Sequence, residues 1–290
     1  MEISVVIPAY NAENFIALQL EALLGNSLLP HEIIVSDNGS NDRTRKIVLD
    51  WGRKNSIIRC VDSSLRRGVS YARNIGCLSA RGKFILICDA DDIVAPNWVE
   101  KMSAALRDAE IVGSGHQLLL FDKESSSYYL GASKTMQPQV FEGVFYNLGA
   151  SIGFRSELFN SLGGFDTSYQ AGHDEVDFCL RAAEKRFKSR WIPEPLIQYR
   201  QRLSEKALAR QSRNYGRTWV QLIINFTPIY DQYLPSLKLM LRKTLPGIPQ
   251  YFMRRHHEWN EIRGFWWNIG VLEGVVKYQI LKAMPARRLI

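Results

Sequence analysis

Short runs of apolar residues, each followed by polar turn residues and then by a helical pattern, dominate the first third of the chain. Apolar runs of this length are typical of buried strands, and strands that alternate with helices form parallel sheets covered on both faces. The pattern predicts strands at residues 3–7, 32–36, 57–61 and 84–88. Between them it predicts helices at about residues 13–24, 42–54 and 70–80. The chain therefore begins as an α/β fold.

The residues that follow the predicted strands are polar. Residues 8–11 follow the first strand, residues 37–42 the second and residues 89–92 the fourth. Ligands of parallel sheets bind at the carboxyl ends of the strands, so these segments are expected to meet at one edge. Together they bring five carboxylates to that edge: Asp37, Asp42, Asp89, Asp91 and Asp92.

The segment 89–92 holds three acids in four residues. Like charges so close together destabilise a fold unless a cation or hydrogen-bond donors offset their repulsion. Magnesium and manganese prefer oxygen ligands, often one or two carboxylates completed by substrate phosphates. The same acids could instead favour the N-terminal end of a helix expected near Pro96. Their position at the sheet edge favours a site for a divalent metal and a diphosphate.

Two further acidic segments each allow two interpretations. Residues 37–42 could form an Asx-rich turn before the next helix, or contact a nucleotide through side chains, because the phosphate-binding glycine spacing is absent. Asp174 and Glu175 stand at a predicted helix start, where the helix dipole favours carboxylates, and either could also act as a general base. Spacing alone leaves these alternatives open.

The alternation of strands and helices loosens after Asp92. A second compact stretch spans residues 149–181, and the last strand is predicted at 190–192, ended by Pro193 and Pro195. From about residue 204 the pattern is helical, with breaks expected at four prolines, Pro228, Pro235, Pro246 and Pro249. We therefore predict a sheet-containing domain over residues 1–200 and a helical extension over residues 201–290.

The positive charge of the chain lies in its last third. The formal net charge is +8, and residues 191–290 hold 16 basic and only 6 acidic side chains. Basic helices that carry tryptophans can lie on an anionic membrane, or the extension could be a helical lid with its basic face in solvent. Nucleic-acid binding is not expected, because no DNA- or RNA-binding motif accompanies the charge.

The sequence also gives an expected compartment. The four cysteines lack the spacing of metal or redox motifs, which favours a reducing environment. The N-terminal residues do not have the pattern of a signal peptide, and no run of about 18 apolar residues could span a bilayer. We expect a cytoplasmic protein, either free or attached to the inner face of the cytoplasmic membrane.

Five motifs together resemble those of family 2 glycosyltransferases, which are inverting, nucleotide-sugar-dependent enzymes. Their sequences in this chain are SVVIPAYN at 4–11, VSDNGSNDRT at 35–44, GVSYARNIG at 68–76, CDADD at 88–92, and GGFD at 163–166 followed by DEVD at 174–177. The resemblance covers about two thirds of the chain. It implies the GT-A fold, a Rossmann-like, mainly parallel sheet flanked by helices.

The resemblance also implies roles for single residues. In the donor site, Asp37 would bond the nucleotide base, with Pro8, Ala9 and Tyr10 lining its pocket, Arg73 would hold the diphosphate side, and Asp89 and Ala90 would lie at the ribose. Asp91 would bind the divalent metal, Mn²⁺ or Mg²⁺. The acids Asp174 and Glu175 match the family's catalytic pair with the two acid types exchanged. By position the base would be Glu175, with Asp174 as the alternative.

The resemblance implies the transfer of one sugar at a time from a nucleotide sugar, with a UDP-sugar favoured, to a hydroxyl of a saccharide or lipid-linked acceptor. The cellular role expected is cell-surface polysaccharide or glycolipid synthesis. Two departures stand out: the Gln-x-x-Arg-Trp motif of processive members is absent, and residues 197–202 lack the metal-contacting histidine of many relatives. Arg200 or Arg202 could assist the diphosphate instead. The alternative function is a catalytically silent protein that binds nucleotide sugars.

Overall fold

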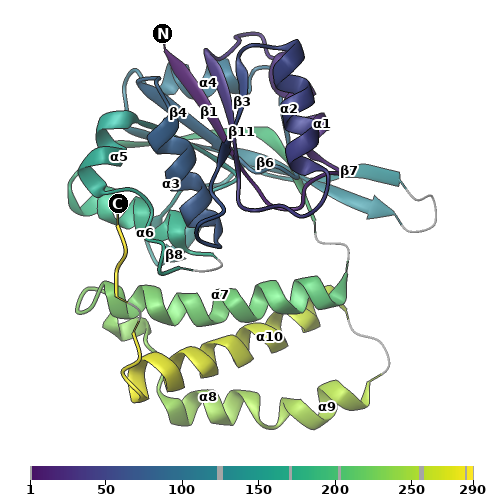
Figure 1. The fold of residues 1–290 in the computed structure, drawn as a ribbon. Coiled ribbons are helices and arrows are strands. Elements are labelled where there is room, and N and C mark those ends of the chain that lie inside the picture. Colours follow the sequence, from purple (N-terminus) through teal and green to yellow (C-terminus); the bar gives the residue numbers. More distant parts are fainter. Residues whose placement is uncertain are drawn as a thin grey trace. The chain divides into compact units, whose positions relative to one another are not determined.

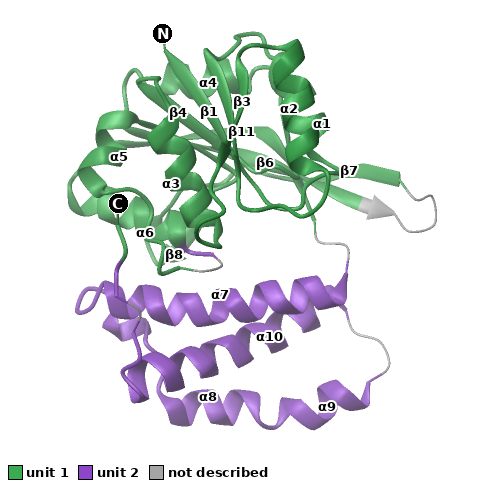
Figure 2. Cartoon of the chain, in the orientation of Figure 1, with its two compact units in different colours: residues 1–170, 174–201, 288–290 green, residues 171–173, 202–287 purple. Residues whose placement is uncertain are grey.

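The computed structural model describes residues 2–122, 127–169, 172–201, 204–254, 258–284 and 286–289. The chain forms two compact units (Figure 2). The sheet unit comprises Met1–Gln170, Asp174–Gln201 and Arg288–Ile290, and the helical unit comprises Ala171–His173 and Arg202–Arg287. Each unit is built around its own packed apolar residues.

The strands of the sheet unit form one mixed sheet in the order β3-β2-β1-β4-β10-β6-β11-β5, with β7 paired to β6 (Figure 1). The four strands at one side are parallel, whereas β10 runs antiparallel between β4 and β6. A short separate pair is formed by β8 and β9. The strands are β1 Ile3–Ala9, β2 Glu32–Asp37, β3 Ile58–Asp62, β4 Phe84–Cys88, β5 Ile93–Val94, β6 Ile111–Asp122, β7 Ser127–Lys134, β8 Gln139–Phe141, β9 Val144–Phe145, β10 Ser151–Arg155 and β11 Ser189–Arg200.

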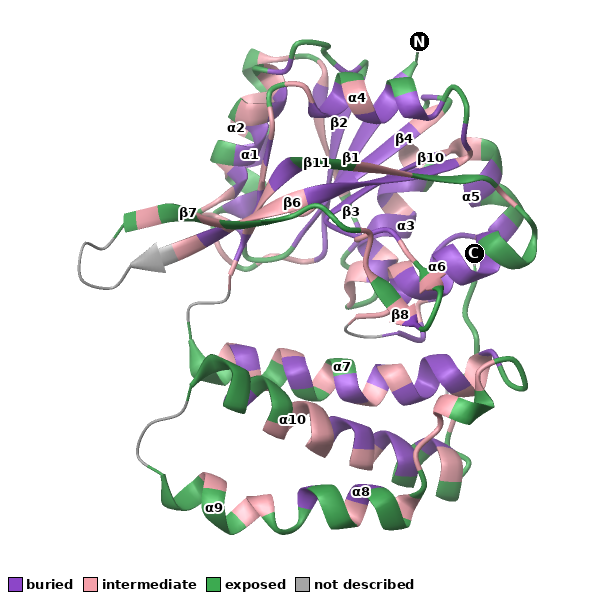
Figure 3. Ribbon diagram, turned by 180° about the vertical axis from the view of Figure 1, so that it is seen from behind, coloured by how far each residue is buried: buried purple, intermediate pink, exposed green. Residues whose placement is uncertain are grey.

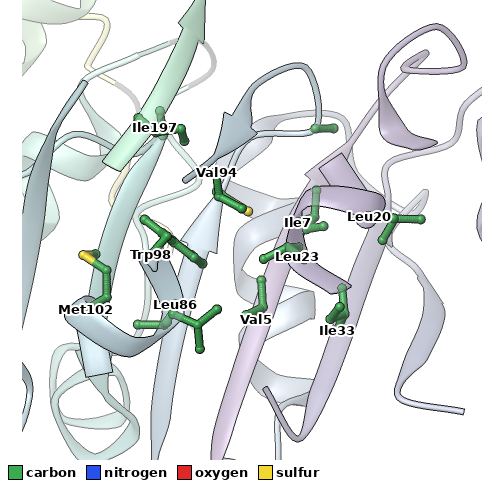
Figure 4. Packing of buried hydrophobic residues seen from close by; sticks show 14 of the residues in the cluster. Val5, Ile7, Leu20, Leu23, Ile33, Leu86, Val94, Trp98, Met102 and Ile197 are labelled. Carbon is green, nitrogen blue, oxygen red and sulfur yellow. The ribbon is translucent and has the colours of Figure 1, made fainter. Parts of the chain in front are cut away.

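Helices cover both faces of this sheet. Because side chains alternate along a strand, Val5 and Ile7 of β1 enter one core and Val6 enters the other. Trp98 of α4 and Leu20 and Leu23 of α1 pack into the first core (Figure 4). The second core contains four mutually packed phenylalanines. The helices are α1 Ile16–Leu24, α2 Thr44–Lys54, α3 Val69–Ser79, α4 Trp98–Ala105, α5 Ser156–Leu162 and α6 Asp174–Glu184.

The helical unit is organised around α7 and α10. Two glycines, Gly216 and Gly270, let these helices approach closely, since a Cβ at either position would collide with the backbone carbonyl of Trp267 or Arg213. Ser204 caps α7 by accepting a hydrogen bond from the Ala207 N–H at 3.2 Å. The elements are α7 Glu205–Asn225, the 3₁₀ turn η1 Asp231–Tyr233, α8 Leu237–Thr244, α9 Gly247–Met253, α10 Trp259–Gly274 and the π-helical turn η2 Val275–Ile280.

The structure confirms the predicted α/β class and the first four strands, with shifts of one or two residues at their ends. The prediction for the last strand is wrong. It does not stop at Pro193 and Pro195, because β11 continues to Arg200 and absorbs the prolines at irregularities in its pairing with β6. Pro249 does not break a helix either. It lies in the first turn of α9, where a missing N–H breaks no helical hydrogen bond.

Among the described residues, no helix is both long enough and apolar enough to cross a bilayer.

Leu86 lies in β4 at the centre of the sheet and is fully buried, so its replacement tests the core. We expect Leu86→Ala to lower the free energy of unfolding by about 2–5 kcal/mol, because the substitution removes apolar contacts and leaves a cavity. Leu78→Ala on α3 is the control, since Leu78 is 57% exposed, and we expect it to change stability by less than about 0.5 kcal/mol. Urea denaturation measures both, and equal effects would contradict this assignment of the core.

Candidate functional site

The predicted base pocket lies where β1 and β2 end side by side. Ala9 is paired with Asp37, and the Asn38 N–H donates to the Ala9 carbonyl at 2.8 Å. Pro8 and Ala9 are buried in β1, whereas Tyr10 is 49% exposed and lies 4.8 Å beneath the Arg67 guanidinium. Asp37 is buried and accepts a hydrogen bond from the Ser40 N–H at 3.2 Å. Tyr10 is thus the exposed member of the predicted lining.

Asn38 ties this strand end to the segment before α3, a role that the sequence analysis missed. Its Nδ2 donates to the carbonyls of Ser63 at 2.5 Å and Arg66 at 2.8 Å. Its Oδ1 accepts from the Gly68 N–H at 2.9 Å. Gly68 has a φ of +134°, a conformation that favours glycine. One buried amide therefore fixes the path of the chain into α3.

Asp42 has a structural role instead of a place in the site. Its carboxylate accepts from the Thr44 N–H at 2.9 Å and from the Glu13 N–H at 3.0 Å. Although burial opposes it, these hydrogen bonds lower the pKa of Asp42. For this residue the turn interpretation is correct, because its oxygens are used by the loop itself.

Arg73 of α3 gathers three predicted site residues around one buried guanidinium. Its Nη1 lies 2.7 Å from Asp174 Oδ2 and 3.9 Å from Glu175 Oε2, and its Nη2 lies 3.4 Å from Asp89 Oδ1. These acids come from the end of β4 and the start of α6. Burial alone would lower the pKa of Arg73, but the three negative charges outweigh it and raise that pKa.

The residues next to Arg73, in space and in sequence, show why its guanidinium fits here and why asparagine follows it. At Gly149 a Cβ would lie 2.5 Å from Arg73 Nη2, so only glycine leaves room for the guanidinium. Asn74, the next residue, donates to the Phe165 carbonyl and accepts from the Phe165 N–H, both at 2.8 Å. Within the Ala-Arg-Asn sequence of α3, Arg73 therefore contacts the acids, and Asn74 fixes the loop that carries Phe165.

The two acids at the start of α6 differ in exposure. Asp174 is 1% exposed, and its second oxygen, Oδ1, has no hydrogen-bond partner among the described residues. The Glu175 side chain is 17% exposed. Burial and the charge of Asp174 raise the pKa of Glu175 to about 8, against the opposing charge of Arg73. Asp174 is thus held by the arginine, whereas Glu175 keeps access to solvent.

Asp177, the third acid of this motif, points elsewhere. It forms a buried ion pair with Arg181 at 2.7 Å, and Arg181 also donates to the carbonyls of Leu162 and Gly164. These bonds join α6 to the loop after α5. Asp177 therefore supports the fold of the site.

The acidic loop after β4 is held by Arg200 at the end of β11. The Arg200 N–H donates to Asp92 Oδ1 at 2.8 Å, and its Nε donates to the Asp91 carbonyl at 2.7 Å. Its guanidinium lies between the rings of Phe15 and Tyr128, at 4.5 and 4.2 Å. Arg200 therefore braces the loop. Arg202, the other arginine considered for the diphosphate, lies outside the described residues.

Asp92 shows how concentrated the negative charge of this loop is. It is buried, and its Oδ2 has no hydrogen-bond partner among the described residues. Burial and the charges of Asp91 and Asp89 raise its pKa well above the ordinary value. A bound cation would relieve this repulsion, so the oxygen donors of the loop fit a divalent metal that takes its remaining ligands from water and phosphate. A preformed cluster of three or more metal-ligating side chains is absent from the described part of the chain.

Family models identify the class of protein. Residues 4–163 match the model for "Glycosyl transferase family 2", and residues 84–272 match the model for "Glycosyl transferase family group 2". The first match alone covers more than half of the chain. The chain therefore belongs to glycosyltransferase family 2, as the motifs predicted.

Several bacterial proteins are similar in sequence. The putative glycosyltransferase EpsE of Bacillus subtilis is 25% identical over 268 residues, which cover 89% of this chain and 93% of EpsE. The uncharacterized glycosyltransferase EpsJ of the same organism is 34% identical over 126 residues, covering 43% of this chain. The matched region spans only 35% of EpsJ and 42% of GlyG from Streptococcus pneumoniae.

Solved structures confirm the GT-A fold. The mannosyltransferase PcManGT of Pyrobaculum calidifontis, in complex with GDP-Man and Mn²⁺, matches with a TM-score of 0.64 and 17% identity, covering 97% of this chain and 88% of its own. S. aureus TarS 1–349, in complex with UDP-GlcNAc, matches with a TM-score of 0.59 and 17% identity, covering 99% and 93%.

Replacing Arg73 tests the charge cluster. We expect Arg73→Ala to lower the free energy of unfolding by about 3–5 kcal/mol, because it leaves the buried Asp174 without its partner. Arg53→Ala is the control, since Arg53 forms an exposed ion pair with Asp50 and its loss should cost less than about 1 kcal/mol. Both changes are read from urea denaturation at neutral pH. A similar small effect for the two variants would show that the cluster does not bear on stability.

Proposed function

We propose that the chain is a non-processive, inverting glycosyltransferase that moves a sugar from a nucleotide sugar to an acceptor hydroxyl. One observation carries the proposal: the buried Arg73 contacts Asp89, on the predicted donor side, and Asp174 and Glu175, on the predicted base side. This arrangement places a cation and a carboxylate of raised pKa together. A transfer that develops negative charge on a leaving diphosphate and removes a hydroxyl proton uses both.

The donor site of the proposal extends from the end of β1 to the acidic loop. Asp37 would bond the nucleotide base, Pro8, Ala9 and Tyr10 would line that pocket, and Asp89 with Ala90 would lie at the ribose. Arg73 would attract the diphosphate. A UDP-sugar is the proposed donor, supported by the fold shared with S. aureus TarS, which is described in complexes with UDP and UDP-GlcNAc.

A divalent metal, Mn²⁺ or Mg²⁺, fits the acidic loop, and Asp91 is the residue proposed to hold it. When bound, such a metal supplies positive charge that stabilises the departing nucleoside diphosphate. Neighbours of the same fold, PcManGT and GalNAc-T7, are described in complexes that contain Mn²⁺. The bracing of the Asp91 carbonyl by Arg200 would keep the loop in place as charge develops.

Glu175 is the proposed general base. It would accept the acceptor hydroxyl proton while that oxygen bonds to the anomeric carbon from the face opposite the diphosphate. The bond from the anomeric carbon to the phosphate oxygen breaks in the same step, and its electron pair leaves with the nucleoside diphosphate. Glu175 suits this role better than Asp174, because Asp174 is already bound to Arg73 at 2.7 Å and is almost fully buried.

The proposed acceptor is a saccharide or a lipid-linked sugar, and the proposed role is in cell-surface polysaccharide or glycolipid synthesis. One relative, 24% identical over 203 residues, is named glucosyl-dolichyl phosphate glucuronosyltransferase of Haloferax volcanii. The second candidate function is a catalytically silent protein that binds nucleotide sugars. The exchanged acid types at Asp174 and Glu175 favour that alternative, because they change the length of the side chain at the base position.

The donor site can be tested without an acceptor. We expect a UDP-sugar with Mn²⁺ to raise the melting temperature of the purified protein, and chelation of the metal to weaken this effect. Asp91→Ala should lose the metal-dependent part of the shift, whereas Asp108→Asn, at an exposed acid beyond α4 that pairs with Arg190, should keep it. Thermal shift with a panel of nucleotide sugars measures each of these effects. No response to any nucleotide would contradict the proposed donor site.

The base is tested by Glu175→Gln, which keeps the shape of the side chain but cannot accept the proton. We expect this variant to lower kcat about 10²–10⁴-fold while the nucleotide-dependent thermal shift remains. Glu157→Gln, at an exposed position on α5, is the matched control and should leave kcat unchanged. Donor binding without any transfer in the unmodified protein, across a panel of acceptors, would support the silent alternative.

The pH dependence gives a second measurement on the same residue. A base must be deprotonated to act, so activity should rise with pH through the pKa of Glu175. We expect kcat/KM to show a rising limb with a midpoint near 8, because burial and Asp174 raise that pKa to about 8. The limb should be absent from the residual activity of Glu175→Gln. A limb that stays in the variant would assign the titration to another group.

A further inference from the structure

The second layer of the helical unit is an amphipathic pair, α8 and α9. Their inward positions recur at helical spacing and pack toward α10. Met240 is buried with Val271 and Val275. The Tyr251 ring stacks on Phe265 with centroids 4.1 Å apart, and its hydroxyl accepts from Trp266 Nε1 at 3.1 Å. These contacts show which side of α8 and α9 faces α10.

Much of α8 and α9 is exposed (Figure 3), and several of the exposed residues are large and apolar. Leu239 and Leu245 are 43% and 52% exposed, and Phe252 and Met253 are 69% and 76% exposed. Phe252 and Met253 directly follow Tyr251, so the packing of Tyr251 holds the helix with these two side chains outward. Scattered single apolar residues are ordinary on a surface. Here four exposed large apolar residues fall within residues 239–253, on two consecutive helices and the cap between them.

Three basic side chains lie on α8, close in sequence to Leu239 and Leu245. Lys238, Arg242 and Lys243 are exposed, and none has an acidic partner within 4.0 Å among the described residues. Residues 232–257 contain no aspartate or glutamate. Two other exposed arginines of this unit do have acidic partners, Arg213 with Glu273 and Arg254 with Glu261.

We propose that this outer face docks on an anionic lipid bilayer. The face consists of Lys238, Leu239, Arg242, Lys243, Leu245, Phe252 and Met253. Exposed apolar side chains at helix surfaces enter the headgroup region of a membrane, and unpaired basic side chains beside them bind anionic headgroups. A nucleic acid would match the charge but would leave the apolar side chains in water. The proposal does not depend on the transfer reaction, because it rests on the helical unit alone.

Co-sedimentation of the full chain with vesicles tests the charges of the face. We expect binding to vesicles that contain phosphatidylglycerol, weaker binding at high salt, and little binding to phosphatidylcholine alone. K238E/R242E/K243E should lower the partition coefficient at least about tenfold, since each basic residue near an anionic surface contributes a factor of about five. K46E/R53E/K54E on α2 changes the net charge equally at exposed positions and should bind like the unmodified chain.

The apolar part of the face needs its own pair of variants. F252S/M253S should lower vesicle binding, whereas L65S/M136S removes two even more exposed apolar side chains from the sheet unit and should not. Circular dichroism checks that all variants are folded.

Four results would overturn the proposal: no sedimentation with any vesicle, equal binding to phosphatidylcholine, equal loss in the matched controls, or a short DNA duplex that binds with the same dependence on the variants. The last result would make nucleic acid the partner. A failed nucleotide-sugar thermal shift, by contrast, would count against the proposed function and leave the lipid result standing.

Discussion

The burial of the Arg73 guanidinium is the constraint on which the arrangement of the site depends. An ionised group removed from water costs many kcal/mol unless opposite charges and hydrogen bonds replace the lost solvent. Asp174, Asp89 and Glu175 supply those charges from two other segments of the chain. The sheet unit can therefore bury Arg73 only when the end of β4 and the start of α6 both lie beside α3. The fold and the site are specified by the same contacts.

This constraint also assigns different roles to two adjacent acids. Asp174 offsets the charge of Arg73, and burial together with the negative charge of Asp174 raises the pKa of Glu175 to about 8. A carboxyl that is partly exposed and has such a pKa can exchange a proton near neutral pH, whereas an ordinary glutamate is already ionised there. In the proposed mechanism the pair would provide a fixed acid, Asp174, and a proton-exchanging acid, Glu175, at the start of α6.

Periodicity predicted the early strands, because it reports local structure. The GT-A fold and the residues now found around Arg73 were implied by the resemblance of five motifs to those of family 2 glycosyltransferases. The sequence did not predict that β11 would pass through Pro193 and Pro195, since pairing with β6 outweighs the local preference of proline. Nor did it separate Asp42 from the site or show that Arg200 braces the acidic loop. These outcomes depend on contacts between residues far apart in sequence, which spacing does not report.

The acid clusters of the sheet unit and the outer face of α8 and α9 differ in whether their charged side chains have partners of opposite charge. The sheet unit concentrates carboxylates at strand ends and offsets them with buried arginines, Arg73 at the acid pair and Arg200 at the acidic loop. The outer face of α8 and α9 instead keeps Lys238, Arg242 and Lys243 in solvent without acidic partners. Internal pairing is what a catalytic site needs, because its charges must hold fixed positions before substrate arrives. Exposed charge without an acidic partner adds little to the stability of the helical unit, and beside exposed apolar side chains it is the basis of the proposed contact with an anionic membrane.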